Sequence, residues 1–277
     1  ASRLKNWIAC NYTTVNEINK KDLKKKDQST TEIIRKKRGD EFEAKIYQKL
    51  IKQYPKYIKI KNDDDKIQKT KEAIKKGYDL IHKPYEGWSG EIDFLIKNKS
   101  KKTKKGKWMY EVYDTKLSSI AQTDHITQIS LYSEWLATQQ DNELPEFMYL
   151  ILAIKSNENN FLEIDEDVKR YKTLDYQLYF NKNNKNYTQF LENNKKDVNP
   201  ERCSFCSMCE WNEACDKIWL EKDHLNQIAK IRSDQIIKIF FWILLILLIL
   251  HLSIDVCTEK KNKKNININF FHKYNFY

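Results

Sequence analysis

The sequence predicts an α/β fold in which helices flank a mixed central β-sheet. Three observations carry this prediction: a helical stripe of apolar positions over 43–54, strand-like segments between 78 and 116, and a long helical segment followed by a buried apolar run over 123–154. The order helix, three strands, helix and strand is typical of a mixed sheet covered by helices.

Composition narrows the class of protein. The chain has 277 residues, enough for one domain of about 230 residues and an appendage, or for two small domains. Its 50 Lys and Arg against 39 Asp and Glu give a net charge of +11, which favours polyanionic partners such as nucleic acid or an anionic membrane. Only 5 glycines and 4 prolines exclude collagen-like, linker-dominated and glycine-rich phosphate-loop architectures. The first residues lack an apolar segment, so we expect no signal peptide there.

The N-terminal third is expected to be helical in two places. Residues 1–38 read as a short helix and a solvated basic connector. The stripe that begins at Glu43 predicts an amphipathic helix ending at Pro55, and because Glu43 lies on this stripe its carboxylate should point inward. A second helix is expected over 66–76, where Gly77 stops it.

Three strands are expected next, over 78–82, 90–97 and 108–116. The lysine-rich segment between the last two is either a solvated loop or the turn of a hairpin centred near residues 103–104. In a hairpin of that register Asp93 lies almost opposite Asp114.

The remaining elements complete the predicted sheet. A helix is expected over 123–139, a buried strand over 146–154 and a further short strand over 160–164. Helices are expected over 174–193 and 207–222.

Several residues on these predicted strands and on the following helix have side chains suited to metal-dependent chemistry. Asp114 and Lys116 are two apart on one strand and share a face, where a carboxylate can hold a divalent cation while the ammonium orients a water. Asp93 supplies the second carboxylate that Mg²⁺ or Mn²⁺ prefers. Gln128 and Tyr132 are four apart on a helix and can hydrogen-bond a phosphate backbone or brace Lys116. The alternative is a set of surface residues and satisfied ion pairs.

Four motifs resemble those of RecB-family nucleases of the PD-(D/E)XK superfamily, found alone or ahead of a superfamily 1 helicase. They are Gly39-x-x-x-Glu43, Gly90-x-x-Asp93, Asp114-Thr115-Lys116-Leu117 and Gln128-x-x-x-Tyr132. The resemblance covers residues 2–235. It implies a restriction-endonuclease-like core.

The same resemblance implies roles for individual residues. Asp93 and Asp114 would bind Mg²⁺ or Mn²⁺, Lys116 would support attack of water on a DNA phosphodiester, and Glu43 would act from the first helix. Many relatives carry a metal-binding His one residue before that Glu, where this chain has Phe42. The expected function is a metal-dependent DNA nuclease acting on single-stranded ends or flaps in repair or recombination, with a helicase as a further partner. The alternative is a catalytically weakened nucleic-acid-binding module.

Four of the six cysteines crowd into 13 residues, namely Cys203, Cys206, Cys209 and Cys215. Such clustering indicates metal or cluster ligation in a reducing compartment, cytoplasmic or nucleoplasmic, rather than disulfides.

The triplet Cys206-x2-Cys209-x5-Cys215 resembles the C-terminal triplet of iron–sulfur RecB-like nucleases, whose fourth ligand lies far upstream, where Cys10 stands here. This implies a [4Fe–4S] cluster that staples both ends of the domain. The alternative is a local Zn²⁺ site that also uses Cys203.

The composition changes after residue 235, so we expect a domain over 1–235 and a separate tail over 236–277. Residues 239–250 are twelve consecutive apolar residues, about 18 Å as a helix against a bilayer core of about 30 Å. Three interpretations stay open: a short membrane anchor, a buried helix, or translation beyond the true reading frame. A membrane partner is not favoured.

Overall fold

The computed structural model describes most of the chain in eight segments: residues 2–18, 24–61, 64–85, 90–155, 164–193, 198–228, 231 and 234–251. Its internal contacts divide the chain into two units. The first comprises residues 1–199 and 209–211, and the second comprises residues 200–208 and 212–277. The expected boundary after residue 235 stays a prediction.

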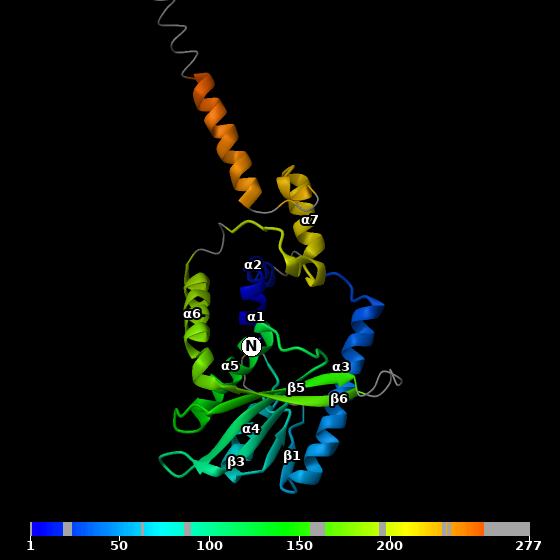
Figure 1. Ribbon diagram of the computed structural model, residues 1–277, viewed down its shortest axis with the longest axis vertical. Helices are drawn as coiled ribbons and strands as arrows, with labels where there is room; N and C mark the ends of the chain where they lie inside the picture. The colour runs from blue at the N-terminus through cyan, green and yellow to red at the C-terminus, as the bar shows by residue number, and fades with distance from the viewer. Residues whose placement is uncertain are drawn as a thin grey trace, which may run out of the picture. The chain divides into compact units, whose positions relative to one another are not determined.

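A six-stranded mixed sheet organises the first unit, with the strands in the order β1-β2-β3-β4-β5-β6 (Figure 1). The pairs β1/β2 and β4/β5 are parallel, and the other three are antiparallel. The predicted α/β class with a mixed sheet is therefore confirmed. The strands are β1 (Tyr57–Lys59), β2 (Leu80–His82), β3 (Phe94–Lys102), β4 (Trp108–Lys116), β5 (Phe147–Lys155) and β6 (Ile164–Lys172).

Helices cover both faces of this sheet. Phe42 and Ile46 of α3 pack on one face in a core with Phe94 and Ile151. Residues of α4 and α5 fill the larger core on the other face. The helices of the unit are α1 (Ser2–Ala9), α2 (Tyr12–Ile18), α3 (Thr30–Gln53), α4 (Lys66–Lys76), α5 (Thr123–Gln139) and α6 (Thr173–Glu192).

Helix α3 begins well before the predicted start, so the expected solvated connector is wrong from Thr30 onward. Ser29 caps the helix: its Oγ accepts from the backbone N–H of Glu32, and the Glu32 carboxylate accepts from the backbone N–H of Ser29. This Ser-x-x-Glu capping box is a start signal that the basic residues around it obscured.

The lysine-rich hairpin is present, with its turn over residues 103–107 between β3 and β4. Strand β4 and helices α4 and α5 have the predicted bounds. Strand β3 begins at Phe94 rather than at residue 90, and β1 was not predicted because three residues are too few to show a period.

The last two strands of the sheet were predicted unequally. β5 matches the apolar run, and α6 matches the expected helix within one residue at each end. The short strand expected over 160–164 falls almost wholly outside the described residues. β6 starts at Ile164 and was missed because an edge strand rich in charged residues lacks the alternating pattern of a half-buried strand.

The second unit is helical where it is described. The helix expected over 207–222 is shorter, because Ser204–Met208 form a 3₁₀ turn (η2) and α7 spans only Asn212–Glu221. A further turn, η3, spans Leu225–Gln227.

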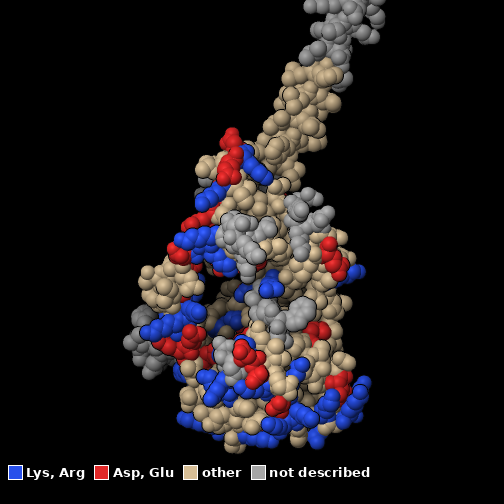
Figure 2. Space-filling view, turned by 180° about the vertical axis from the view of Figure 1, so that it is seen from behind, with Lys and Arg blue, Asp and Glu red and all other residues tan. Residues whose placement is uncertain are grey.

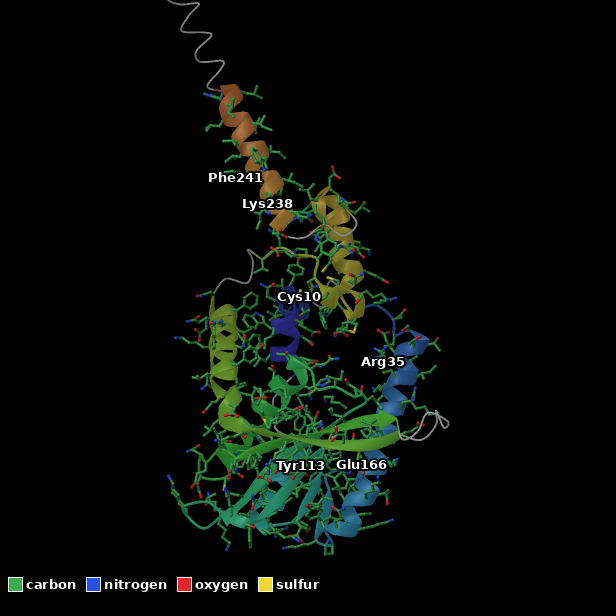
Figure 3. All side chains as sticks on the ribbon, viewed as in Figure 1. Cys10, Arg35, Tyr113, Glu166, Lys238 and Phe241 are labelled. Atoms are coloured by element: carbon green, nitrogen blue, oxygen red, sulfur yellow. The ribbon has the colours of Figure 1, made fainter. Side chains whose placement is uncertain are left out.

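The apolar part of the tail forms a helix, Asp234–His251. Its large side chains are mostly exposed, and Figure 3 shows Phe241 among those that project from it. The buried-helix interpretation is therefore wrong. By length and composition this one helix could cross a bilayer, which alone is weak evidence for a membrane protein.

Gly77 ends α4 in the left-handed conformation, with φ of 67°, and lies against the indole of Trp108. A Cβ at this position would stand 2.3 Å from the indole Nε1. Gly106 in the hairpin turn also has positive φ, 79°, but a Cβ there meets no atom of the described residues within 4 Å.

We predict that Gly77→Ala lowers the free energy of unfolding by about 2–4 kcal/mol, because backbone strain and overpacking add. Gly106→Ala, the matched control, carries the strain alone and should cost about 1 kcal/mol. Urea unfolding of both variants measures the difference. Equal losses would show that Trp108 does not press on Gly77.

Candidate active site at the open end of the β3–β4 hairpin

The open end of the β3–β4 hairpin carries two of the predicted acids. Phe94 pairs with Tyr113, so the same register sets Asp93 opposite Asp114, one step further along. The Asp93 carboxylate is fixed by Thr115, whose backbone N–H and Oγ1 donate to Asp93 Oδ2 at 2.7 and 2.6 Å. The hairpin thus positions one carboxylate through the backbone of the neighbouring strand.

Asp114 and Lys116 form a buried ion pair on β4. The Asp114 carboxylate is 1% exposed and contacts the Lys116 ammonium directly. Burial raises the pKa of Asp114 to about 6, with Asp93 adding to the rise and Lys116 opposing it. Burial works to lower the pKa of Lys116, but the charges of Asp114 and Asp93 raise it above its ordinary value. Lys116 is therefore an ammonium at neutral pH.

Glu43 lies inward on α3, as its place on the apolar stripe predicted, and is only 8% exposed. Its two oxygens meet two cationic or potentially cationic partners: His82 Nε2 lies 2.7 Å from Oε1, and Lys83 Nζ donates to Oε2 at 2.5 Å. Burial works to raise the pKa of Glu43, but these two partners hold it below its ordinary value. The His82 ring itself stacks on Tyr47 and Phe94.

Lys83 joins the acids from different elements. Besides Glu43, its ammonium lies 3.2 Å from Glu91 Oε1 and 3.5 Å from Asp93 Oδ1. Burial works to lower the pKa of Lys83, but Asp93, Glu43 and Glu91 together raise it well above its ordinary value. One ammonium therefore stands among three carboxylates, and through it Glu43 is connected to Asp93.

Sequence reasoning missed His82, Lys83 and Glu91 as members of this site. His82 is the last residue of a three-residue buried strand. A histidine directly after two apolar residues is the one local signal that could have identified it as a site residue. Lys83 enters the cluster because its backbone turns to φ of 58° after β2, which a lysine in a lysine-rich sequence does not reveal.

Gln128 and Tyr132 project together, as predicted for positions four apart on α5, with 3.0 Å between Gln128 Nε2 and the Tyr132 hydroxyl. That hydroxyl donates to the Glu91 carbonyl at 3.1 Å, and the ring is buried. Gly90 leaves the room for this contact, since a Cβ there would stand 2.6 Å from the hydroxyl. Tyr132 therefore positions the Gly90–Glu91 segment, and the side chain nearer to the surface is Gln128.

The donor set fits a hard divalent cation. Asp93, Asp114, Glu43 and Glu91 supply carboxylate oxygens, the ligands that Mg²⁺ and Mn²⁺ prefer. Across the described ranges, no three His, Cys, Asp or Glu side chains already converge as a metal-ligand group. The positive charge beside these carboxylates comes from lysine ammonium groups. Phe42, the residue directly before Glu43, is buried in the core beneath α3.

The cysteines divide between the two units. Cys10 and Cys209 belong to the first unit, and Cys203, Cys206 and Cys215 belong to the second. Within the second, the Sγ atoms of Cys203 and Cys206 lie 3.8 Å apart, and the Cys203 N–H donates to Cys206 Sγ. Cys203 therefore lies beside Cys206, a predicted ligand, and a local zinc site that uses Cys203 needs this proximity. The set that includes Cys10 stays a prediction.

No family model, curated protein or solved structure matches this chain. The assignment of the site therefore depends on the motifs and on the geometry given above.

We predict that Lys83→Met tightens Mn²⁺ binding by about tenfold, because removal of one nearby ammonium leaves three carboxylates for the cation. Isothermal titration with Mn²⁺ measures the affinity. Lys97→Met is the matched control, since Lys97 is also a half-buried lysine paired with a carboxylate, at 2.5 Å from Asp79, but away from these acids. An unchanged or weaker affinity in Lys83→Met would contradict the account.

Proposed function

We propose that the protein is a metal-dependent DNA nuclease that hydrolyses phosphodiester bonds, acting on single-stranded ends or flaps in repair or recombination. The observation that carries the proposal is the register of the β3–β4 hairpin, which sets Asp93 opposite Asp114 with Lys116 two residues on. The net charge of +11 supports a polyanionic substrate. The motif resemblance supports DNA as the substrate and a helicase domain or subunit as an assembly partner. The clustered cysteines support a reducing compartment, cytoplasmic or nucleoplasmic.

The residues of the site have separate tasks in this proposal. Asp93 and Asp114 would hold Mg²⁺ or Mn²⁺, which when bound polarises the phosphate and lowers the pKa of water. Lys116 stays protonated beside Asp114 and Asp93, so it stabilises negative charge or orients the water and does not take the water's proton. Glu43 anchors Lys83 and His82 at the same end of the sheet.

Hydrolysis adds one water across the scissile bond. The water oxygen bonds to phosphorus, the bond from phosphorus to the leaving oxygen breaks, and the leaving oxygen takes up a proton. In this proposal Gln128 would contact the phosphate backbone, while Tyr132 holds the Glu91 segment through its hydrogen bond to the Glu91 carbonyl.

Two observations favour a second candidate function. The Lys83 ammonium already pairs with three of the carboxylates, and Phe42 stands where the nucleases that the motifs resemble carry a metal-binding histidine. Both features suit a weakened enzyme that retains nucleic-acid binding through its fold and its cysteine site. Tight DNA binding with steep salt dependence, and no cleavage with any divalent ion, would select this function.

We predict that Asp114→Ala and Lys116→Ala each reduce Mn²⁺- or Mg²⁺-dependent cleavage of single-stranded DNA by at least about 100-fold. Asp167→Asn, which changes a carboxylate paired with Lys169 on the edge strand β6, is the control and should cleave like the wild type. Cleavage is followed on end-labelled oligonucleotides. Undiminished activity in both site variants would refute the assignment.

We further propose that Cys10, Cys206, Cys209 and Cys215 bind a [4Fe–4S] cluster, with zinc on Cys203, Cys206, Cys209 and Cys215 as the alternative. The 3.8 Å contact between Cys203 and Cys206 supports the zinc alternative, whereas the spacing of the triplet supports the cluster.

We predict that anaerobically purified protein absorbs at about 400 nm and that Cys10→Ala loses this band, because a four-thiolate cluster loses a ligand. Cys203→Ala is the matched control and should keep the band. A colourless protein that holds one zinc, and loses it in Cys203→Ala but not in Cys10→Ala, would overturn the cluster.

A further inference from the structure

A second candidate site lies at the opposite end of β4 from the acids. A pocket of about 470 Å³ opens there in the first unit. Its lining comes from α4, the end of α5 and the start of β4, namely Lys71, Ile74, Lys75, Lys107, Trp108 and Gln139. The pocket shares no residue with the acidic site, and its chemistry is not used by the proposed hydrolysis.

The aromatic wall of the pocket is Trp108, which was predicted only as a strand residue. Its side chain is 37% exposed, although β4 carries buried residues directly after it. Gly77 packs against the indole so closely that a side chain at residue 77 would not fit. A rigid, partly exposed indole in a pocket is a surface on which a flat ring can stack.

Lysines surround this indole. Lys97 Nζ lies 4.5 Å and Lys102 Nζ 4.6 Å from the ring centroid, and three more lysines line the pocket. Lys97 is fixed by Asp79 and by the Gly77 carbonyl, while Lys102 is exposed. No described lining residue carries a carboxylate, but Lys107 is already paired, because its Nζ lies 2.5 Å from Asp141 Oδ1. Figure 2 shows lysine and arginine side chains gathered at the lower end of the molecule, on the face seen there.

An aromatic ring among several ammonium groups matches the chemistry of one nucleotide: a base stacks on the ring and its phosphate pairs with the lysines. A lipid headgroup or a free phosphate would use the lysines but not the indole. An apolar ligand would use the indole but not the lysines. The observed combination therefore favours a nucleic-acid strand with an unpaired base.

We propose that this pocket binds one nucleotide of a single-stranded nucleic acid, with its base on Trp108 and its phosphate at Lys71 and Lys75 of α4. This inference deepens the proposed function and rests on it, because the nuclease assignment is what places the scissile bond of the bound nucleic acid at the acidic site. Trp108 and Asp114 are six residues apart on one strand, about 20 Å, a span that a few nucleotides of extended single strand cover. The pocket would thus anchor the substrate at a fixed distance from the scissile bond.

The test is equilibrium binding of a fluorescent 20-nucleotide single strand to the full chain in EDTA, where no cleavage occurs. Base stacking is worth about 1–3 kcal/mol, so Trp108→Ala should weaken binding by about 5- to 150-fold, while Trp108→Phe stays near the wild type. Lys71→Ala and Lys75→Ala should each lower the slope of log K against log salt by about 0.7. Lys169→Ala, on the edge strand β6, is the control and should leave the affinity unchanged.

Two outcomes would overturn the proposal: Trp108→Ala binding as tightly as the wild type with its fold intact by circular dichroism, or an abasic strand binding as tightly as a normal one. The second outcome would reduce the pocket to a phosphate site. Asp114→Ala separates this inference from the proposed function, because it should abolish cleavage and keep strand binding. If Asp114→Ala still cleaves while Trp108→Ala loses binding, the nuclease assignment of Asp114 fails and the pocket stands.

Discussion

Carboxylates gather at the open end of the β3–β4 hairpin, with Asp114 and Glu43 buried, and two ammonium groups compensate their charge. The rest of the site is arranged around this compensation. Lys116 pairs with Asp114 on β4, and Lys83 stands among Glu43, Glu91 and Asp93. Removing charges from water costs several kcal/mol for each ion, which a partner at contact distance offsets only in part. A domain that selection had shaped for stability alone would place apolar residues here. The retained charges are therefore the strongest physical sign of function in the first unit.

The fold brings these charges together from elements far apart in the sequence. Helix α3 delivers Glu43 from one face of the sheet, the turn after β2 delivers Lys83, and β4 delivers Asp114 and Lys116. Tyr132 of α5 then fixes the Glu91 segment from the opposite face. Because these groups come from several elements on both faces of the sheet, the complete sheet with both helix layers is needed to assemble the site.

Much of this could be predicted from local patterns. The bounds of β4, α4 and α5 follow from clean alternation or helical periodicity, and the hairpin register follows from its length. Asp93, Asp114, Lys116 and Glu43 were singled out by residue type and order, and the structure sets Asp93 opposite Asp114 with Lys116 in contact with Asp114.

What could not be predicted depended on contacts that no local period reports. Lys83 is one of many lysines in the chain, and it reaches the carboxylates only because its backbone adopts a positive φ. β6 is an edge strand and β1 has three residues, so neither shows a buried pattern. The pocket at Trp108 requires Gly77, thirty-one residues earlier, to lie against the indole. Such pairs emerge only when the sheet and α4 are packed together.

The central claim is that these carboxylates form a site for a divalent cation. Titration of Mn²⁺ into the wild-type chain and into the double variant Asp93→Asn/Asp114→Asn, at pH 7.5 with folding checked by circular dichroism, tests it most directly. The account predicts one site in the wild type and at least an about tenfold loss of affinity in the double variant. Equal Mn²⁺ binding by a folded double variant would contradict it.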